Sequence, residues 1–220
     1  MKKAFTLAEV LITLGIIGIV AAMTIPTLMQ RYTEKKTVSV LRETQSILAQ
    51  ALKMSAEENG DADGWGLEHK MSSADAKAIA DKLLLYIKIA VDCGVMDNNG
   101  ICAPNKLYKR LDGGNWQTYY DRTEYYKVKL LNGSSIWWRS AHVGEVDTNG
   151  STQFVVFIDT NGPTMPNTWG KDLFAFYVYS NSVKPMGDPY DMYKNTCNKK
   201  DTGIGCAYYV LSQNNMNYLH

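Results

Sequence analysis

The chain has 220 residues, of which 45% are hydrophobic and 11% aromatic, and its formal net charge is +1. This composition excludes an intrinsically disordered chain, because enough apolar surface is available to build a core. The near-neutral charge argues against a protein whose main task is to neutralise nucleic-acid phosphates. Without the first 30 residues, about 190 remain, which is enough for one ordinary domain.

The first predicted element is an apolar helix near the N-terminus. No charged side chain occurs over the 21 residues from Val10 to Gln30, whereas Lys2, Lys3 and Glu9 come before them. At about 1.5 Å per residue such a helix reaches roughly 30 Å, the thickness of a bilayer core. A cleaved secretory signal or a plain membrane anchor would account for the apolar run, but neither accounts for Glu9.

The stretch KKAFTLAEVLITLGIIGIVAA, residues 2–22, resembles the N-terminal processing segment of type IV pilins and type II secretion pseudopilins. In that family, prepilin peptidase cleaves on the cytoplasmic side of the membrane, directly before a phenylalanine, and methylates the new amine. The resemblance implies cleavage between Ala4 and Phe5, where the family usually has glycine in place of the alanine. Residues 1–4 would then be the leader peptide, and residues 5–30 the transmembrane half of an assembly helix.

Cleavage before Phe5 supplies a physical reason for Glu9. The new amine is a cation at a helix start, where the helix dipole is already positive, so it requires an anion. In the family this glutamate pairs with the terminal amine of a neighbouring subunit, and buried charges persist only when they are paired. The resemblance therefore implies that Glu9 is an assembly residue. The alternative is that its carboxylate only lies among the lipid headgroups.

The resemblance also implies a function and a location. It implies a non-enzymatic structural subunit that polymerises through its N-terminal helix, in a pseudopilus of type II protein secretion. The alternatives are a type IV pilin or minor pilin for adhesion, motility or DNA uptake, and a monomeric, membrane-tethered binding domain. The chain would cross the inner (cytoplasmic) membrane once. Residues 31–220, including the amphipathic half of the helix, would form a globular head in the periplasm or on the cell surface.

The implied partners follow from the same family. They are copies of the chain itself, other pilin-like subunits, prepilin peptidase and the inner-membrane assembly platform. Nucleic acid is not an expected partner. The alternative is an aromatic and basic surface for single-stranded DNA, formed by Trp137-Trp138-Arg139 and Glu124-Tyr125-Tyr126-Lys127. Because adjacent strand residues point to opposite faces, we expect instead one tryptophan buried and the other half-exposed.

Beyond the membrane the helix pattern continues and becomes one-sided. Apolar positions over residues 34–58 cover an arc of about 160°, and Asn59-Gly60 is a stop signal. We therefore predict one helix over about residues 5–58, with a bend near Pro26. Its second half requires a partner, which in the family is the sheet of the head.

The remaining elements predict an α+β fold, in which the long helix packs on an antiparallel sheet, as in pilins. A second helix is predicted from Ser72 or Ser73 to about Val91. The signal Asn132-Gly133 predicts a hairpin. Strands are predicted over residues 124–131, 134–141, 153–158 and 173–179, with a possible fifth over 207–212.

The four cysteines, Cys93, Cys102, Cys197 and Cys206, form two intervals of nine residues. None fits a CxxC metal or redox pattern. An even number in an exported chain favours two disulfides, and four cysteines allow three pairings. We favour the two local pairs because short loops close with less loss of entropy. Four buried free thiols are the alternative.

One segment offers metal ligands: FIDTNGPTMPNTWGKDLF, residues 157–174, between two predicted strands. Its Asp and Asn side chains carry the hard oxygens that calcium prefers, although it is not an EF-hand loop. It resembles the calcium-binding loop between late strands of major pseudopilins. That resemblance implies Asp159, Asn161 and Asp172 as calcium ligands. The alternative is a turn-rich loop in which these side chains bond their own backbone.

Overall fold

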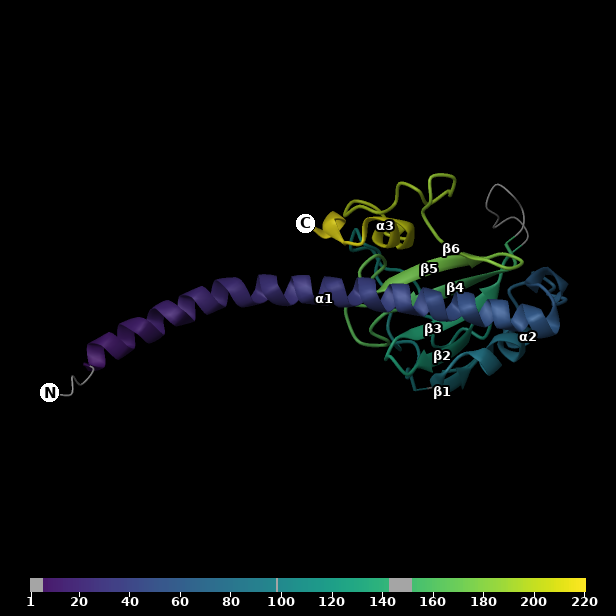
Figure 1. Cartoon of the computed structure of the whole chain (residues 1–220), viewed down its shortest axis with the longest axis horizontal. Helices are drawn as coiled ribbons and strands as arrows, with labels where there is room; N and C mark the ends of the chain where they lie inside the picture. The colour runs from purple at the N-terminus through teal and green to yellow at the C-terminus, as the bar shows by residue number, and fades with distance from the viewer. Residues whose placement is uncertain (1–5, 98, 143–151) are drawn as a thin grey trace. The chain divides into compact units, whose positions relative to one another are not determined.

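The computed structural model describes residues 6–97, 99–142 and 152–220, and the chain divides into two units, Met1–Lys36 and Thr37–His220. Helix α1 (Leu7–Asn59) begins in the first unit and ends in the second (Figure 1). Its bounds confirm the long helix predicted from the sequence, and Pro26 lies inside it without ending it.

The second unit is built on one antiparallel sheet of six strands, which lie side by side in chain order. A long N-terminal helix followed by this sheet confirms the predicted α+β, pilin-like architecture. The bounds of the strands are β1 (Ile89–Gly94), β2 (Tyr126–Leu130), β3 (Ser135–Ser140), β4 (Phe154–Asp159), β5 (Leu173–Val178) and β6 (Val183–Pro185). Two further helices are α2 (Ser73–Leu83) and α3 (Cys206–Gln213), with short 3₁₀ helices η1 (Ala62–Gly64), η2 (Leu84–Tyr86) and η3 (Asn217–Leu219).

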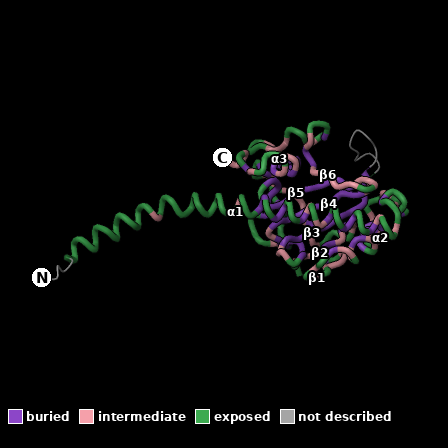
Figure 2. Tube along the Cα trace, in the orientation of Figure 1, coloured by how far each residue is buried: buried purple, intermediate pink, exposed green. Residues whose placement is uncertain are grey.

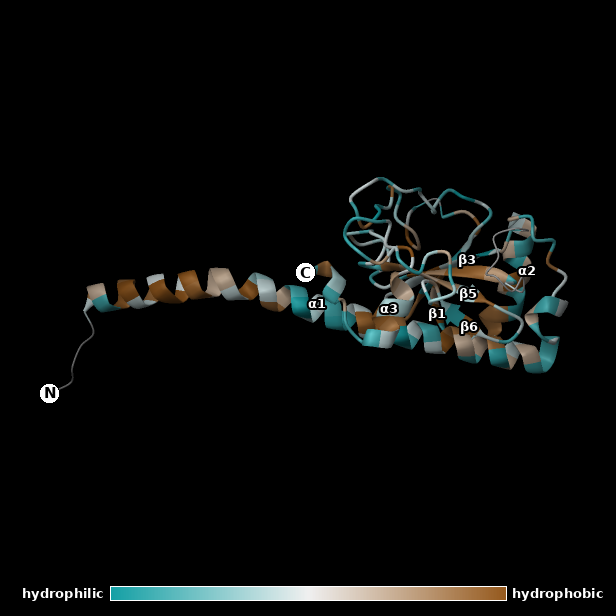
Figure 3. Ribbon diagram, turned by 90° about the horizontal axis from the view of Figure 1, so that it is seen from above, coloured by the Kyte–Doolittle hydropathy of each residue, from teal (hydrophilic) through white to brown (hydrophobic). Residues whose placement is uncertain are grey.

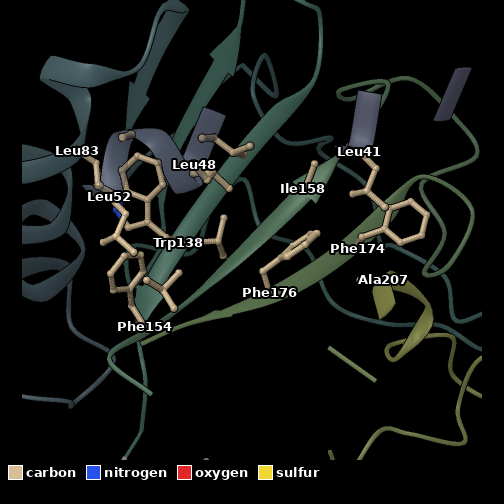
Figure 4. Packing of buried hydrophobic residues seen from close by; sticks show 14 of the residues in the cluster. Leu41, Leu48, Leu52, Leu83, Trp138, Phe154, Ile158, Phe174, Phe176 and Ala207 are labelled. Atoms are coloured by element: carbon tan, nitrogen blue, oxygen red, sulfur yellow. The ribbon is translucent and has the colours of Figure 1, made fainter. Parts of the chain in front are cut away.

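Helices cover one face of the sheet. On this face, side chains of α1, α2 and α3 pack against the aromatic side chains of the strands (Figure 4). Spacings of seven and four residues place Leu41, Leu48 and Leu52 on the same side of α1, which explains why this half of the helix is amphipathic. We call this cluster the helix-side core; its members include Leu41, Leu48, Leu52, Ile79, Leu83, Trp138, Phe154, Val156, Ile158, Phe174, Phe176, Ala207 and Val210.

Long loops cover the opposite face, so buried residues occur on both sides of the sheet (Figures 2 and 3). Strand β4 shows the alternation directly. Phe154 and Val156 enter the helix-side core, whereas Val155 and Phe157 enter the second cluster. We call the second cluster the loop-side core; it contains Ala103, Tyr108, Tyr119, Tyr125, Trp137, Val155, Phe157, Trp169, Leu173, Ala175, Tyr177, Met186 and Ile204.

Two sequence predictions about the elements are wrong, and one further element was missed. The second helix ends at Leu83 rather than near Val91, because Ile89 and Val91 form β1 and pair with β2. Residues 207–212, predicted as a strand, lie in α3. The buried positions of α3 include Cys206, Ala207 and Val210, whose spacings of three and four residues follow a helix rather than a strand. The short strand β6 was not predicted.

Candidate functional site

The apolar half of α1, residues 7–30, carries its hydrophobic side chains on all sides. Every large apolar side chain from Leu7 to Met29 is exposed within this unit, as the green N-terminal tube in Figure 2 shows. By length and composition α1 is suited to cross a membrane. Soluble proteins do not expose a continuous apolar surface of this extent without a partner. Lipid or neighbouring helices therefore supply the burial that the chain itself does not.

Two threonine hydroxyls within this half bond the backbone of their own helix. The Thr13 hydroxyl donates to the Val10 carbonyl and the Thr24 hydroxyl to the Val20 carbonyl, both at 2.9 Å. These bonds satisfy the hydroxyl donors where no water is available. In the sequence, Glu9 carries the one ionisable side chain of residues 6–30.

The structure places Glu9 in a capping box at the start of α1. Its Oε2 atom accepts hydrogen bonds from the backbone amide and the hydroxyl of Thr6, both at 2.8 Å, and its own amide donates to Thr6 Oγ1 at 3.3 Å. This reciprocal arrangement satisfies two amides that a helix start leaves unpaired. The T-x-x-E signal was present in the sequence, but its capping role was not predicted. Ala4 and Phe5, at the expected cleavage position, lie outside the described residues.

The second candidate site lies where β4 and β5 join. Asp159 ends β4 and pairs with the first residue of β5, and Asp172 directly precedes that strand. Both carboxylates are buried. Asp159 accepts hydrogen bonds from the Tyr108 hydroxyl and from the amide of Asn161, the latter at 3.2 Å. The hairpin thus brings together two of the predicted calcium ligands, Asp159 and Asp172, at the connected ends of β4 and β5. The third, Asn161, lies beside them.

Backbone amides also engage these carboxylates. Asp172 accepts from the amides of Asn167 and Thr168 at 2.7 and 2.6 Å. These bonds agree with the alternative prediction, a turn-rich loop whose side chains bond their own backbone without a metal ion. Two further groups have no such explanation: Asn161 Oδ1 and Asn167 Oδ1 are buried and, within the described residues, have no hydrogen-bond partner. Asn167 was not among the predicted ligands.

The electrostatics of the hairpin favour a cation. Burial, together with the negative charge of Asp172, raises the pKa of Asp159 well above its usual range. Burial likewise raises the pKa of Asp172 to about 6, although backbone amides oppose the rise. Two buried carboxylates and two unpaired amide oxygens form a hard, all-oxygen donor set, and these residues therefore fit calcium. Bound there, the ion would supply charge neutralisation and hold the two strand ends together.

The structure pairs all four cysteines locally, as Cys93–Cys102 and Cys197–Cys206. This is the pairing that loop entropy favoured. Asp97 lies within the first disulfide loop, and its carboxylate accepts the amides of Ile101, Cys102 and Ala103. The sulfurs of Cys93 and Cys102 are oxidised, and the Asp97 carboxylate has three backbone partners. Asp97 and this disulfide therefore hold the loop in place.

The candidate surface for single-stranded DNA is not a surface. Trp137 and Trp138 are both fully buried, so the prediction that one is half-exposed is wrong. The reason is that both faces of the sheet are covered: Trp137 lies in the loop-side core and Trp138 in the helix-side core. Arg139 is also buried. Buried rings do not stack on bases, and this segment therefore serves packing.

Comparison with known families supports the reading of the N-terminal segment. A family model described as the prokaryotic N-terminal methylation motif matches residues 1–25. This motif is that of pilin-type subunits, which prepilin peptidase processes and which assemble with other pilin subunits. The chain is therefore a pilin-like subunit, and the long apolar helix near its N-terminus fits a single-pass membrane anchor. A search of curated proteins and one of solved structures each find no significant match. A second family model covers residues 27–211, most of the chain, and the protein accordingly belongs to the family that this model describes, a family of unknown function (DUF6613).

Proposed function

We propose that this pilin-like subunit polymerises into the pseudopilus of a type II protein secretion system. The observation that carries the proposal is Glu9, a single carboxylate at the start of an apolar helix half whose side chains the chain itself leaves uncovered. A membrane tether could use this side chain only as a helix cap, a role that an uncharged glutamine would also fill, whereas a helical bundle of subunits also uses its negative charge. The subunit is structural and performs no catalytic step.

In this proposal the division of the chain follows its processing. Residues 1–4 are removed as the leader, residues 5–30 cross the inner membrane and later line the filament, and residues 31–220 form the head in the periplasm. The inner-membrane assembly platform extracts each subunit and adds it to the growing filament. Loss of the leader with one added methyl group, measured by intact mass, is the expected state of the purified subunit. Cleavage after Ala22 would contradict it and indicate a secreted soluble protein.

The role of Glu9 in assembly is separable from its role in the capping box. Gln at the same position keeps the cap but removes the charge, Ala removes both, and Thr6→Ala weakens the cap while leaving the carboxylate. We expect Glu9→Gln and Glu9→Ala to insert into the membrane but to be absent from sheared or cross-linked filaments, and Thr6→Ala to be incorporated. Normal incorporation of Glu9→Gln would overturn charge pairing as the assembly device.

Deletion of the gene distinguishes secretion from a surface pilus. Loss of secreted proteins from the medium, with unchanged surface fibres, is expected for a pseudopilin. Loss of surface fibres, adhesion, motility or DNA uptake with normal secretion would favour a type IV pilin or minor pilin instead.

We also propose that the β4–β5 hairpin of the head binds calcium through Asp159, Asn161, Asp172 and Asn167. The two unpaired buried amide oxygens support this over a loop that only bonds its own backbone. The expected result is that calcium raises the melting temperature of the head over that in a chelator. Asp172→Asn should reduce the shift, whereas Asp63→Asn, at an exposed position of η1, should leave it unchanged. No shift at millimolar calcium would reject the site.

A further inference from the structure

A cavity of about 530 Å³ opens between the loop that follows β6 and helix α3. It lies on a part of the chain for which neither membrane anchoring nor calcium binding provides a use. Its volume is in the range of small-molecule sites, which cover about 300–1,000 Å³. The side chains that matter for its chemistry are Lys194, Asn195, Asn198, Tyr208, Tyr209 and Gln213.

The backbone around this cavity is held in place from several directions. The disulfide Cys197–Cys206 joins the loop to the start of α3. Gly187 and Gly205 pack backbone against backbone, since a Cβ on Gly187 would lie 1.9 Å from the Gly205 carbonyl oxygen. Asp191 is buried and accepts the amides of Gly187 and of Tyr193, at 2.6 and 3.1 Å. The walls are therefore preorganised, which lowers the entropic cost of binding a ligand.

Several polar side chains of the lining are not used by the fold. In the part of the chain that the structure describes, no hydrogen bond or ion pair engages the side-chain polar atoms of Lys194, Asn195, Tyr208, Tyr209 or Gln213. By contrast, the Asn198 side chain bonds the backbone of its own loop. The residues that line the cavity thus carry two phenols, two carboxamides and one ammonium group whose hydrogen-bonding capacity the described fold does not use.

We propose that this cavity binds a saccharide. Phenols and carboxamides both donate and accept hydrogen bonds, which matches sugar hydroxyl groups that do the same. The rings of Tyr208 and Tyr209 are half-buried and add apolar surface for the C–H face of a sugar ring. The Tyr209 ring is held edge-on by Tyr218, with centroids 5.2 Å apart. Lys194 is the single cation of the lining, whereas a phosphorylated ligand would call for several charged donors.

The test is saturation-transfer NMR on the full chain in micelles of a detergent without a sugar headgroup. The probes are cellobiose, diacetylchitobiose and digalacturonate. We expect saturable binding of at least one probe, with the strongest transfer to C–H protons on one face of a ring, because these lie against the tyrosines. An affinity near 1 mM would correspond to a short saccharide in an open cavity.

Variants locate the binding. Tyr208→Ala should weaken it about tenfold or more, and the exposed Asn195→Ala and Gln213→Ala each roughly two- to tenfold, as for a lost hydrogen bond. The control is Tyr190→Ala, because Tyr190 is 82% exposed and outside the lining. Near-UV circular dichroism verifies that each variant is folded. Absence of saturable binding for all three probes up to about 10 mM, or equal binding by the pocket variants and the wild type, would overturn the proposal.

Discussion

The two halves of α1 differ in what surrounds them, although they belong to one helix. Over residues 7–30 apolar side chains point in every direction and are exposed, whereas over residues 37–59 they form one stripe that the sheet buries. The pattern of the first half is that of a helix in lipid or in a bundle, and the pattern of the second is that of a helix on a domain. The difference shows that the head buries the apolar side chains of the second half, whereas the membrane or neighbouring subunits bury those of the first half.

The sharpest way to break this comparison is to make the same substitution in each half. Leu52→Ala opens a cavity in the helix-side core, since Leu52 is 1% exposed, and should destabilise the head by about 2–5 kcal/mol. Leu14→Ala removes a side chain that is 61% exposed, and should leave head stability unchanged. Thermal melting of the full chain in detergent, followed by near-UV circular dichroism of the buried aromatics, measures both. Equal losses would show that the two halves unfold as one unit.

The disulfides sharpen the same comparison inside the head. Replacing both Cys93 and Cys102 by alanine should cost about 2–3 kcal/mol, because the unfolded chain regains the entropy of a nine-residue loop. The pair Cys197 and Cys206 has the same separation and should cost at least as much, since Cys206 also belongs to the helix-side core. Membrane insertion of both double variants should be normal. A variant that melts like the wild type would show that its disulfide adds no stability.

The apolar half of α1 could be predicted because a membrane helix is encoded locally. An uncharged run, a charged start and an acid at a defined position specify it without reference to the rest of the chain. Strands β2 to β5 could also be predicted, since each is rich in β-branched and aromatic residues. The end of α2 could not be, because residues 84–91 are apolar in a way that suits a helix, and pairing with β2 decides the outcome.

The second covered face explains the other failures. One of Trp137 and Trp138 was expected at a half-exposed position, because an antiparallel sheet often has one face in contact with water. Here loops with little regular structure bury that face. Their sequence has no periodic pattern of apolar residues from which this burial could be predicted. The proposed calcium ligands illustrate the same limit: Asp159 and Asp172 were candidates by chemistry and resemblance, but the unpaired oxygen of Asn167 became visible only once the loop was folded.

Two helix caps allow a finer comparison between the units. At α2, the Ser72 side chain accepts the amide of Asp75 at 3.0 Å. Ser72→Ala should therefore lower head stability by about 1 kcal/mol. Thr6→Ala weakens the corresponding cap of α1 and should not change head melting, but should speed hydrogen exchange of the first-turn amides. A change of head melting by Thr6→Ala would contradict the separation of the two units.

A pH-dependent effect is expected for Lys127, whose side chain is buried in the head. Its ammonium donates to the carbonyls of Val95, Arg122 and Tyr125 at 2.7–3.0 Å. Burial lowers the pKa of Lys127 to about 8, although nearby carboxylates such as Asp97 oppose the shift. Between this value and the unfolded value of about 10.4, the unfolded chain binds more protons than the folded head, so this residue's contribution to stability rises with pH.

The measurable consequence is a pH-dependent difference between the wild type and Lys127→Met. The variant should be less stable at pH 7, because three buried carbonyls lose their donor. Between about pH 8 and 10, the stability of the wild type should increase relative to that of the variant. The increase should be less than about 1.4 kcal/mol per pH unit, which is the limit for one proton. All four cysteines are paired, so thiol ionisation does not disturb the range. A constant difference across it would mean that the three carbonyls keep the ammonium charged and that hydrogen bonding, rather than burial, sets its pKa.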